Sequence, residues 1–170
     1  SSAASDVYKR QESPFTGASA LALHLAAALA GLTLAQLKRA GVPVVIAAVP
    51  GSMDLRSARP AYGSPELVLN SAAAADLARY LGLPFMGTAG ASESKVLDAQ
   101  AAAEVSLQVM VSALSGAALV HDAGFLDCAD IGSLPLLVLV DEIIGMTARV
   151  MRGVDAVSYT HLTLPTNREV

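Results

Sequence analysis

The strongest constraint on the fold of this chain is a repeated alternation of long helical stretches with short apolar stretches rich in β-branched residues. When a helix connects two successive strands, those strands normally lie parallel in one sheet. The alternation therefore predicts an α-β-α-β-α-β-α order. Helices are expected at 17–40, 65–81, 98–115 and 134–154, and strands at 42–49, 84–88 and 117–121.

Local signals mark the ends of these stretches. Gly41 follows the first helical stretch, where a glycine commonly ends a helix. Ser64 and Pro65 begin the second helix, because serine caps the free N–H groups and proline fits the first turn. Asp98 occupies the same capping position before the third helix.

Two α/β architectures share this alternation: an open doubly wound sheet and a TIM barrel. A dinucleotide-binding doubly wound domain would carry Gly-x-Gly-x-x-Gly after a strand, and no expected strand here is followed by that pattern. Polar residues follow each expected strand, which is where barrel enzymes place their catalytic loops. The sequence therefore favours an α/β fold that is a fragment of a TIM (β/α)8 barrel, with about three βα units.

Composition argues against several classes of protein. The chain is 54% hydrophobic and 15% charged, which suits elements covered by further protein. Its net charge is −4 without any basic run, so no nucleic-acid partner is expected. The apolar stretch 18–37 is rich in alanine and contains His24 and Gln36, so we expect a buried barrel helix rather than a membrane span. A single cysteine, Cys128, fits a cytoplasmic location.

The two ends of the chain carry a different signal. Residues 7–11 can be encoded by GTG TAT AAG AGA CAG, and the reverse complement of that string contains GTC TCT TAT ACA, which encodes residues 157–160. This inverted relation indicates translated sequencing adaptor at 1–11 and 156–170, both expected to be disordered. We therefore expect residues 12–155 to be a partial barrel from a longer protein and to be inactive alone.

Several sequence blocks, in a fixed order, resemble one enzyme family. Residues 87–104, GTAGASESKVLDAQAAAE, resemble its G-x-x-S-D-S-K-x-x-D-x-Q-A-x-x-E block, and residues 115–127, SGAALVHDAGFLD, resemble its G-A-x-x-I-H-D-x-G-Y-L-E block. MDLR at 53–56, GSPE at 63–66 and DEIIGM at 141–146 resemble shorter blocks. The family that these blocks resemble is the trimethylamine methyltransferase family.

The resemblance implies a TIM-barrel enzyme that moves a methyl group from a methylated amine to a cobalt(I) corrinoid. In that family the corrinoid (cobalamin) is carried by a separate cognate protein, so no directly bound cofactor or metal is expected. The activity would serve methylamine metabolism, including methanogenesis, and the intact enzyme could be a homo-oligomer. Some members contain pyrrolysine; its absence here favours a quaternary amine such as glycine betaine over trimethylamine.

The same blocks supply candidate substrate-binding residues, whereas no catalytic residue is assigned. His121 ends an expected strand and could orient a substrate carboxylate, or it could be a packed core histidine. Loop carboxylates could attract a cationic amine, or could cap helices and pair with arginines. Glu93 stands where the family usually has aspartate, and Asp127 stands where glutamate is common. Phe125 replaces a frequent tyrosine. The predicted substrate-binding set is Glu93, His121, Asp122, Phe125 and Asp54.

Two other hypotheses remain open from the residues themselves. Lys95 could form a Schiff base in a barrel lyase or aldolase-type enzyme. Alternatively, the chain could be an inert fragment with no activity of its own. Cys128 has no cysteine or histidine at zinc-ligand spacing, so no metal site is expected around it.

Overall fold

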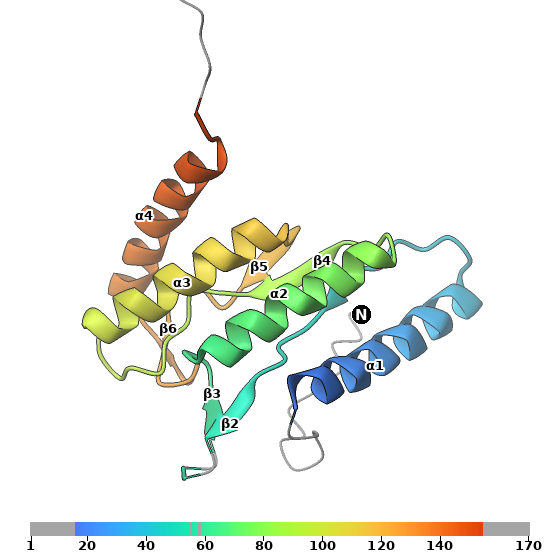
Figure 1. Ribbon diagram of the computed structural model, residues 1–170, viewed down its shortest axis with the longest axis horizontal. Coiled ribbons are helices and arrows are strands. Elements are labelled where there is room, and N and C mark those ends of the chain that lie inside the picture. Colours follow the sequence, from blue (N-terminus) through green and yellow to red (C-terminus); the bar gives the residue numbers. More distant parts are fainter. Residues whose placement is uncertain (1–15, 55, 58, 155–170) are drawn as a thin grey trace, which may run out of the picture.

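The computed structural model describes residues 16–54, 56–57 and 59–154, so the predicted adaptor stretches 1–11 and 156–170 lie outside the described residues. Helices and short strands alternate along the chain (Figure 1). The elements are α1 (Gly17–Lys38), β1 (Ile46–Ala47), β2 (Ser52–Asp54), β3 (Arg59–Ala61), α2 (Pro65–Tyr80), β4 (Phe85–Thr88), α3 (Ala99–Ser115), β5 (Leu119–His121), β6 (Phe125–Leu126), β7 (Ile131–Gly132) and α4 (Leu134–Met151).

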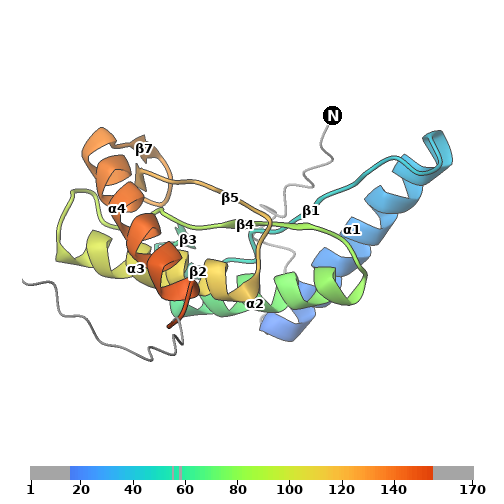
Figure 2. The same ribbon diagram turned by 90° about the horizontal axis from the view of Figure 1, so that it is seen from above.

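A three-stranded parallel sheet in the order β1-β4-β5 forms the centre of the fold. Ile46 pairs with Phe85 in one ladder, and Gly87 pairs with Val120 in the other. Helices α2 and α3 lie between successive strands in the chain and on the same side of the sheet (Figures 1 and 2). The predicted alternation with parallel strands is therefore confirmed as an α/β arrangement.

The first predicted strand, 42–49, is wrong in length, because only Ile46–Ala47 pairs as a strand. Its partner β4 is four residues long and follows Pro84, whose carbonyl accepts from Ile46 N at 3.0 Å. Residues before Ile46 thus extend past the end of β4 and have no strand to pair with. The predicted last helix is also too long, since α4 ends at Met151 rather than at residue 154.

Two short antiparallel hairpins were not predicted from the sequence. β2 pairs with β3, with Asp54 opposite Arg59, and β6 pairs with β7, with Leu126 opposite Ile131. Their strands are only two or three residues long, too short to show the alternating pattern on which strand prediction depends. Both hairpins lie in connections that follow strands of the parallel sheet.

Each helix begins at a polar side chain that accepts a hydrogen bond from the backbone N–H three residues later. Such a cap pairs one of the N–H groups left free at a helix start and typically contributes about 1 kcal/mol. The predicted starts at Ser64 and Asp98 are therefore confirmed as caps. The four capping residues are Thr16, Ser64, Asp98 and Ser133.

The main apolar core lies between α3 and α4. Val105 of α3 and Leu136 and Val140 of α4 have no exposed surface, and Ile143 continues the same stripe on α4. A second cluster packs Phe85 and its sheet neighbours against α2. Side chains at helical spacing thus bury one face each of α2, α3 and α4.

Helix α1 departs from the expectation of a buried barrel helix. Among its described side chains only His24 is buried, while Leu21 and Ala28 are partly buried against the cluster beneath α2. Burial lowers the pKa of His24, in keeping with a packed histidine rather than a ligand. Within the described residues α1 is also the one helix long and apolar enough to cross a membrane, a test that core helices of soluble proteins pass as well.

Helix α4 exposes large apolar side chains, and we therefore expect the 170-residue chain to self-associate. Val138 is 68% exposed and Ile144 is 47% exposed, and large exposed apolar patches drive association. Sedimentation velocity should show larger species as concentration rises. Replacing Val138 and Ile144 together by lysine should shift the chain toward monomer.

The matched control adds the same charge at two exposed positions of α3, Ala103→Lys with Ser106→Lys. This variant should associate like the unmodified chain, since it leaves the apolar faces of α4 intact. A monomeric unmodified chain at every concentration would contradict the prediction.

Candidate functional site

Three loops meet at the carboxyl edge of the parallel sheet, as expected for connections that follow parallel strands. The loop after β4 bonds to the loop after β5 through backbone groups. Gly124 N donates to Gly90 O at 2.9 Å, and Ser92 N donates to Phe125 O at 2.9 Å. The β2–β3 hairpin, which follows β1, supplies the third segment. The predicted gathering of polar loops is thus observed at one edge.

Two glycines allow close packing at this edge: Gly90 lets the two loops approach each other, and Gly124 lets the loop after β5 lie against α4. Gly90 has φ +96°, and a Cβ there would lie 2.9 Å from Ala123 Cα. Gly124 has φ +85°, and a Cβ there would lie 2.9 Å from Leu137 Cβ. A side chain at either position would strain the backbone and push the neighbouring segment away. Both glycines belong to the blocks that resemble the methyltransferase family.

Glu104 of α3 holds the loop that carries Glu93. Its Oε2 accepts from Ser92 Oγ at 2.6 Å and from Glu93 N at 2.9 Å, and its Oε1 accepts from Gln100 Nε2 at 2.7 Å. A Cβ on Gly63 would collide with the Glu104 carboxylate, so that glycine allows the hairpin segment to lie directly against it. Glu104 therefore fixes the loop backbone rather than facing solvent.

The predicted residue Glu93 lies half-buried in this frame. Its Oε1 accepts from Gly63 N at 3.0 Å, which joins the loop after β4 to the end of the β2–β3 segment. Among the described residues, the hydrogen-bond donor to the Glu93 carboxylate is Gly63 N. The carboxylate is thus oriented by backbone and keeps its charge uncompensated by any described basic side chain.

His121 and Asp122 form a paired acid and base at the end of β5. His121 Nδ1 lies 2.7 Å from Asp122 Oδ1, and Thr88 Oγ1 donates to Asp122 Oδ2 at 2.8 Å. Asp122 adopts φ 75°, a left-handed conformation that aspartate tolerates better than most residues. With Nδ1 directed at Asp122, Nε2 is the ring nitrogen that can face a ligand.

The pairing shifts the two pKa values apart. The hydrogen bond to Asp122 raises the pKa of His121, although burial acts in the opposite direction. Burial by itself raises the pKa of Asp122, but the hydrogen bonds from His121 and Thr88 outweigh it, and the net shift is downward. The pair therefore favours an imidazolium beside a carboxylate.

The remaining predicted residues differ in their surroundings. Phe125 lies in β6, is 37% exposed and bridges to Ala91 of the neighbouring loop. Asp54 is exposed and caps its own loop, since its carboxylate accepts from the side chain and N–H of Ser57 and from Arg56 N. The Ser57 hydroxyl, followed by the Arg56 N–H, lowers the pKa of Asp54. No described contact joins Asp54 to the other four candidates.

Sequence reasoning missed Gln108, a buried amide of α3. Its Oε1 accepts from the N–H groups of Gly90 and Ala91 at 2.9 and 3.2 Å. Its Nε2 donates to the carbonyls of Tyr62 and Ala91, each at 2.8 Å. Gln108 follows Glu104 by four residues and so shares its face of the helix, a spacing that could have marked both as supports for the loop.

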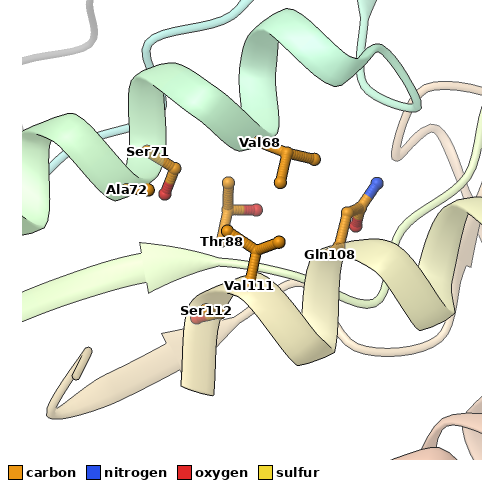
Figure 3. Close-up of a pocket in the computed structure, with 7 residues that line it drawn as sticks. All are labelled: Val68, Ser71, Ala72, Thr88, Gln108, Val111 and Ser112. Carbon is orange, nitrogen blue, oxygen red and sulfur yellow. The ribbon is translucent and has the colours of Figure 1, made fainter. Parts of the chain in front are cut away.

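A small cavity lies between α2, α3 and β4 (Figure 3). Its volume is about 10 Å³, room for one water molecule and too little for a methylated amine. Among the described residues no three His, Cys, Asp or Glu side chains gather closely enough to hold a metal ion. The cavity is lined by Val68, Ser71, Ala72, Thr88, Gln108, Val111 and Ser112.

Comparison with known proteins decides the family. A protein-family model described as "Trimethylamine methyltransferase (MTTB)" matches residues 11–170. The chain belongs to the trimethylamine methyltransferase family. The resemblance stated from its sequence blocks is therefore confirmed.

Individual members of this family are similar over most of the chain. A trimethylamine methyltransferase MttB of Methanosarcina thermophila is 37% identical over 84% of the chain, and a glycine betaine methyltransferase of Desulfitobacterium hafniense Y51 is 38% identical over 82%. A trimethylamine methyltransferase MttB of D. hafniense DCB-2 is 32% identical over 87%. The chain covers 29–30% of the length of these relatives.

The contacts of Gln108 predict that Gln108→Ala loosens the loop after β4. Leaving buried N–H and C=O groups unpaired should destabilise the site by about 2–4 kcal/mol. Hydrogen–deuterium exchange at the Gly90 and Ala91 amides should accelerate. Ser106→Ala, on the exposed side of α3 and bonded to Ala102 O within the helix, is the control, and equal protection in both variants would refute the assignment.

The His121–Asp122 pair predicts a pH-dependent contribution to stability. Because the folded-state pKa of His121 is raised, its contribution is complete below the ordinary value of 6.5 and is lost as pH rises through the raised value. Because the pKa of Asp122 is lowered, its contribution is present above 3.8 and is lost as pH falls through the lowered value.

NMR titration of the histidine rings measures this coupling directly. His121 should titrate above its ordinary value, and Asp122→Asn should move its pKa downward. Asp127→Asn is the control because Asp127 bonds Arg59 instead. An unchanged His121 titration in Asp122→Asn would show that the pair does not form.

Proposed function

We propose that the chain is part of an enzyme that takes a methyl group from a methylated amine and passes it to a corrinoid carried by a partner protein. The observation that carries this proposal is a half-buried, backbone-oriented carboxylate, Glu93, at the loop edge of a chain that belongs to the methyltransferase family. A fixed negative charge attracts a methylated ammonium group without donating a proton to it.

The proposed setting for this site is one sector of a TIM barrel. The parallel strands run in sequential order, and α2 and α3 cover the same face of the sheet, as expected for consecutive βα units of a barrel. The loops at the carboxyl edge would then belong to the catalytic face. The remaining strands would be supplied by a longer polypeptide of the length seen in the relatives.

The chain's own residues would bind and orient the amine. Glu93 would face the cationic head, and Phe125, with 37% of its surface exposed, offers an aromatic face nearby in the paired loop. A cobalt(I) corrinoid on the partner would supply the nucleophile that accepts the methyl group. A group of that size must approach the loops from outside, because the cavity at α2 and α3 holds only a water-sized molecule.

His121 bears on the choice of amine. A raised pKa favours its imidazolium form, which suits a substrate carboxylate such as that of glycine betaine. Trimethylamine has no carboxylate and would gain nothing from this contact. We therefore propose a quaternary amine of the glycine betaine type ahead of trimethylamine, and the relatives carry names of both kinds.

The lyase alternative is less well supported by the surroundings of Lys95. A Schiff-base lysine usually depends on burial or a neighbouring cation to release its proton. Lys95 is exposed in the loop between β4 and α3. No further observation favours a lyase.

The proposal predicts that Glu93→Gln raises KM for the amine in the intact enzyme. The amide keeps an oxygen for Gly63 N but loses the charge. The expected rise is about tenfold, since unit charges near 4 Å at a protein surface interact by about 4 kcal/mol, part of which desolvation offsets. Demethylation is measured with purified partner corrinoid protein, using glycine betaine and trimethylamine in parallel.

Glu142→Gln on the exposed side of α4 serves as the charge-matched control. It should leave KM unchanged. Absence of methyl transfer from both amines in the unmodified enzyme would overturn the proposed function, whereas an unchanged KM in Glu93→Gln would remove Glu93 from the binding site.

A further inference from the structure

We propose that Arg59 is a positioning residue for Glu93, and that it acts by clamping a strained turn beside the Glu93 loop. The proposal rests on the proposed function, because it concerns how the substrate-binding carboxylate is held. Arg59 contacts neither the cavity nor the His121–Asp122 pair in the described structure. Its influence would pass through backbone bonds that flank Glu93.

The strained element is a run of three left-handed residues, none of them glycine. Asp127, Cys128 and Ala129 have φ values of 51°, 59° and 70°. Residues other than glycine enter this region singly and at a cost, so three in succession need outside support. Such conformations persist where surrounding contacts over-determine them, and they gather at functional sites.

Arg59 supplies that support from the β2–β3 hairpin. Its Nη1 donates to Asp127 Oδ1 at 2.8 Å, and its Nη2 donates to Asp127 O at 3.3 Å and to Asp130 Oδ2 at 2.7 Å. The guanidinium therefore binds the carboxylate and carbonyl of Asp127, the first residue of the left-handed run, and the carboxylate of Asp130, which directly follows the run. The forked donor geometry suits arginine and cannot be copied by the single ammonium of lysine.

The clamped turn holds the Glu93 loop on both sides of Glu93. Asp127 N donates to Ser94 O at 2.9 Å, and Cys128 N donates to Ser92 O at 3.1 Å. These carbonyls belong to the residues immediately before and after Glu93. A relaxed turn would withdraw both N–H donors and release the backbone that aims the carboxylate.

The same short segment also reaches Glu93 directly. Arg59 starts β3, and four residues later Gly63 N donates to Glu93 Oε1. Residues 59–63 therefore hold Glu93 in two ways. Gly63 N bonds its carboxylate directly, and Arg59 holds the turn that bonds the backbone on either side of it. A change at Arg59 would disturb both the bond to the Glu93 carboxylate and the bonds to its neighbouring carbonyls, so this one side chain affects the whole position of Glu93.

The closing experiment compares three variants in the intact enzyme with its partner corrinoid protein. Arg59→Gln should raise KM for the amine roughly tenfold to a hundredfold, as expected when a binding group is displaced by about 1 Å. Adding Ala129→Gly should recover most of this loss, because glycine adopts φ near +70° without strain. Rescue of KM by relief of backbone strain at Ala129 would show that Arg59 acts on the site through the left-handed turn.

Arg79→Gln is the matched control for general destabilisation. Arg79 also bonds a carboxylate, Asp76, and a carbonyl, Ser115 O, but it lies on α2 away from the loops. This variant should lower the melting temperature without changing KM. A KM in Arg59→Gln equal to that of the unmodified enzyme, or equally raised in Arg79→Gln, would overturn the positioning role.

Hydrogen exchange separates this proposal from the proposed function. Should the unmodified enzyme transfer no methyl group, the function fails, yet the clamp is still tested by exchange at the Gly63, Asp127 and Cys128 amides. Arg59→Gln should accelerate exchange at all three, and Ala129→Gly should restore protection at Gly63. Unchanged protection in Arg59→Gln would refute the clamp whatever the activity.

Discussion

The loop after β4 depends on two polar side chains of α3, the Glu104 carboxylate and the Gln108 amide. Backbone groups at this edge of the sheet have no neighbouring strand to pair with, and buried N–H and C=O groups that stay unpaired are costly. Glu104 and Gln108 pair four of them between Gly90 and Glu93, and Gln108 also pairs Tyr62 O. The position of Glu93 follows from that arrangement.

The three loops at this edge are also joined to one another, because their backbone groups pair between loops. The loop after β5 is bonded to the loop after β4 through Gly124 and Phe125, and Gly90 permits their close approach. The hairpin joins through Gly63 N and through the arginine clamp at Arg59. Backbone bonds of this kind fix the positions of the three loops relative to one another.

Much of this arrangement could be predicted from residue patterns, but the roles of several residues could not. The sequence predicts Glu93, His121 and Asp122 as site residues because they lie at or after the ends of expected strands, and the structure places their loops together. Asp54 fits the same rule, yet its carboxylate is taken up by Arg56 and Ser57. Spacing along the chain does not show which carboxylate has a local partner, because a turn within three residues satisfies it first.

The sequence by itself determined the α/β alternation, the helix caps and the family, since apolar periodicity, capping residues and ordered motif blocks are local properties. Only the tertiary structure decided the length of β1 and the left-handed turn at 127–129, because both depend on partners distant in the chain. The two hairpins pair locally, but their strands are too short to show an alternating pattern in the sequence. Arg59 and Asp127 lie 68 residues apart, and their contact arises only when the hairpin and the loop after β5 are brought to the same edge. The candidate site therefore depends on contacts between side chains and backbone groups of different loops, which no local sequence pattern predicts.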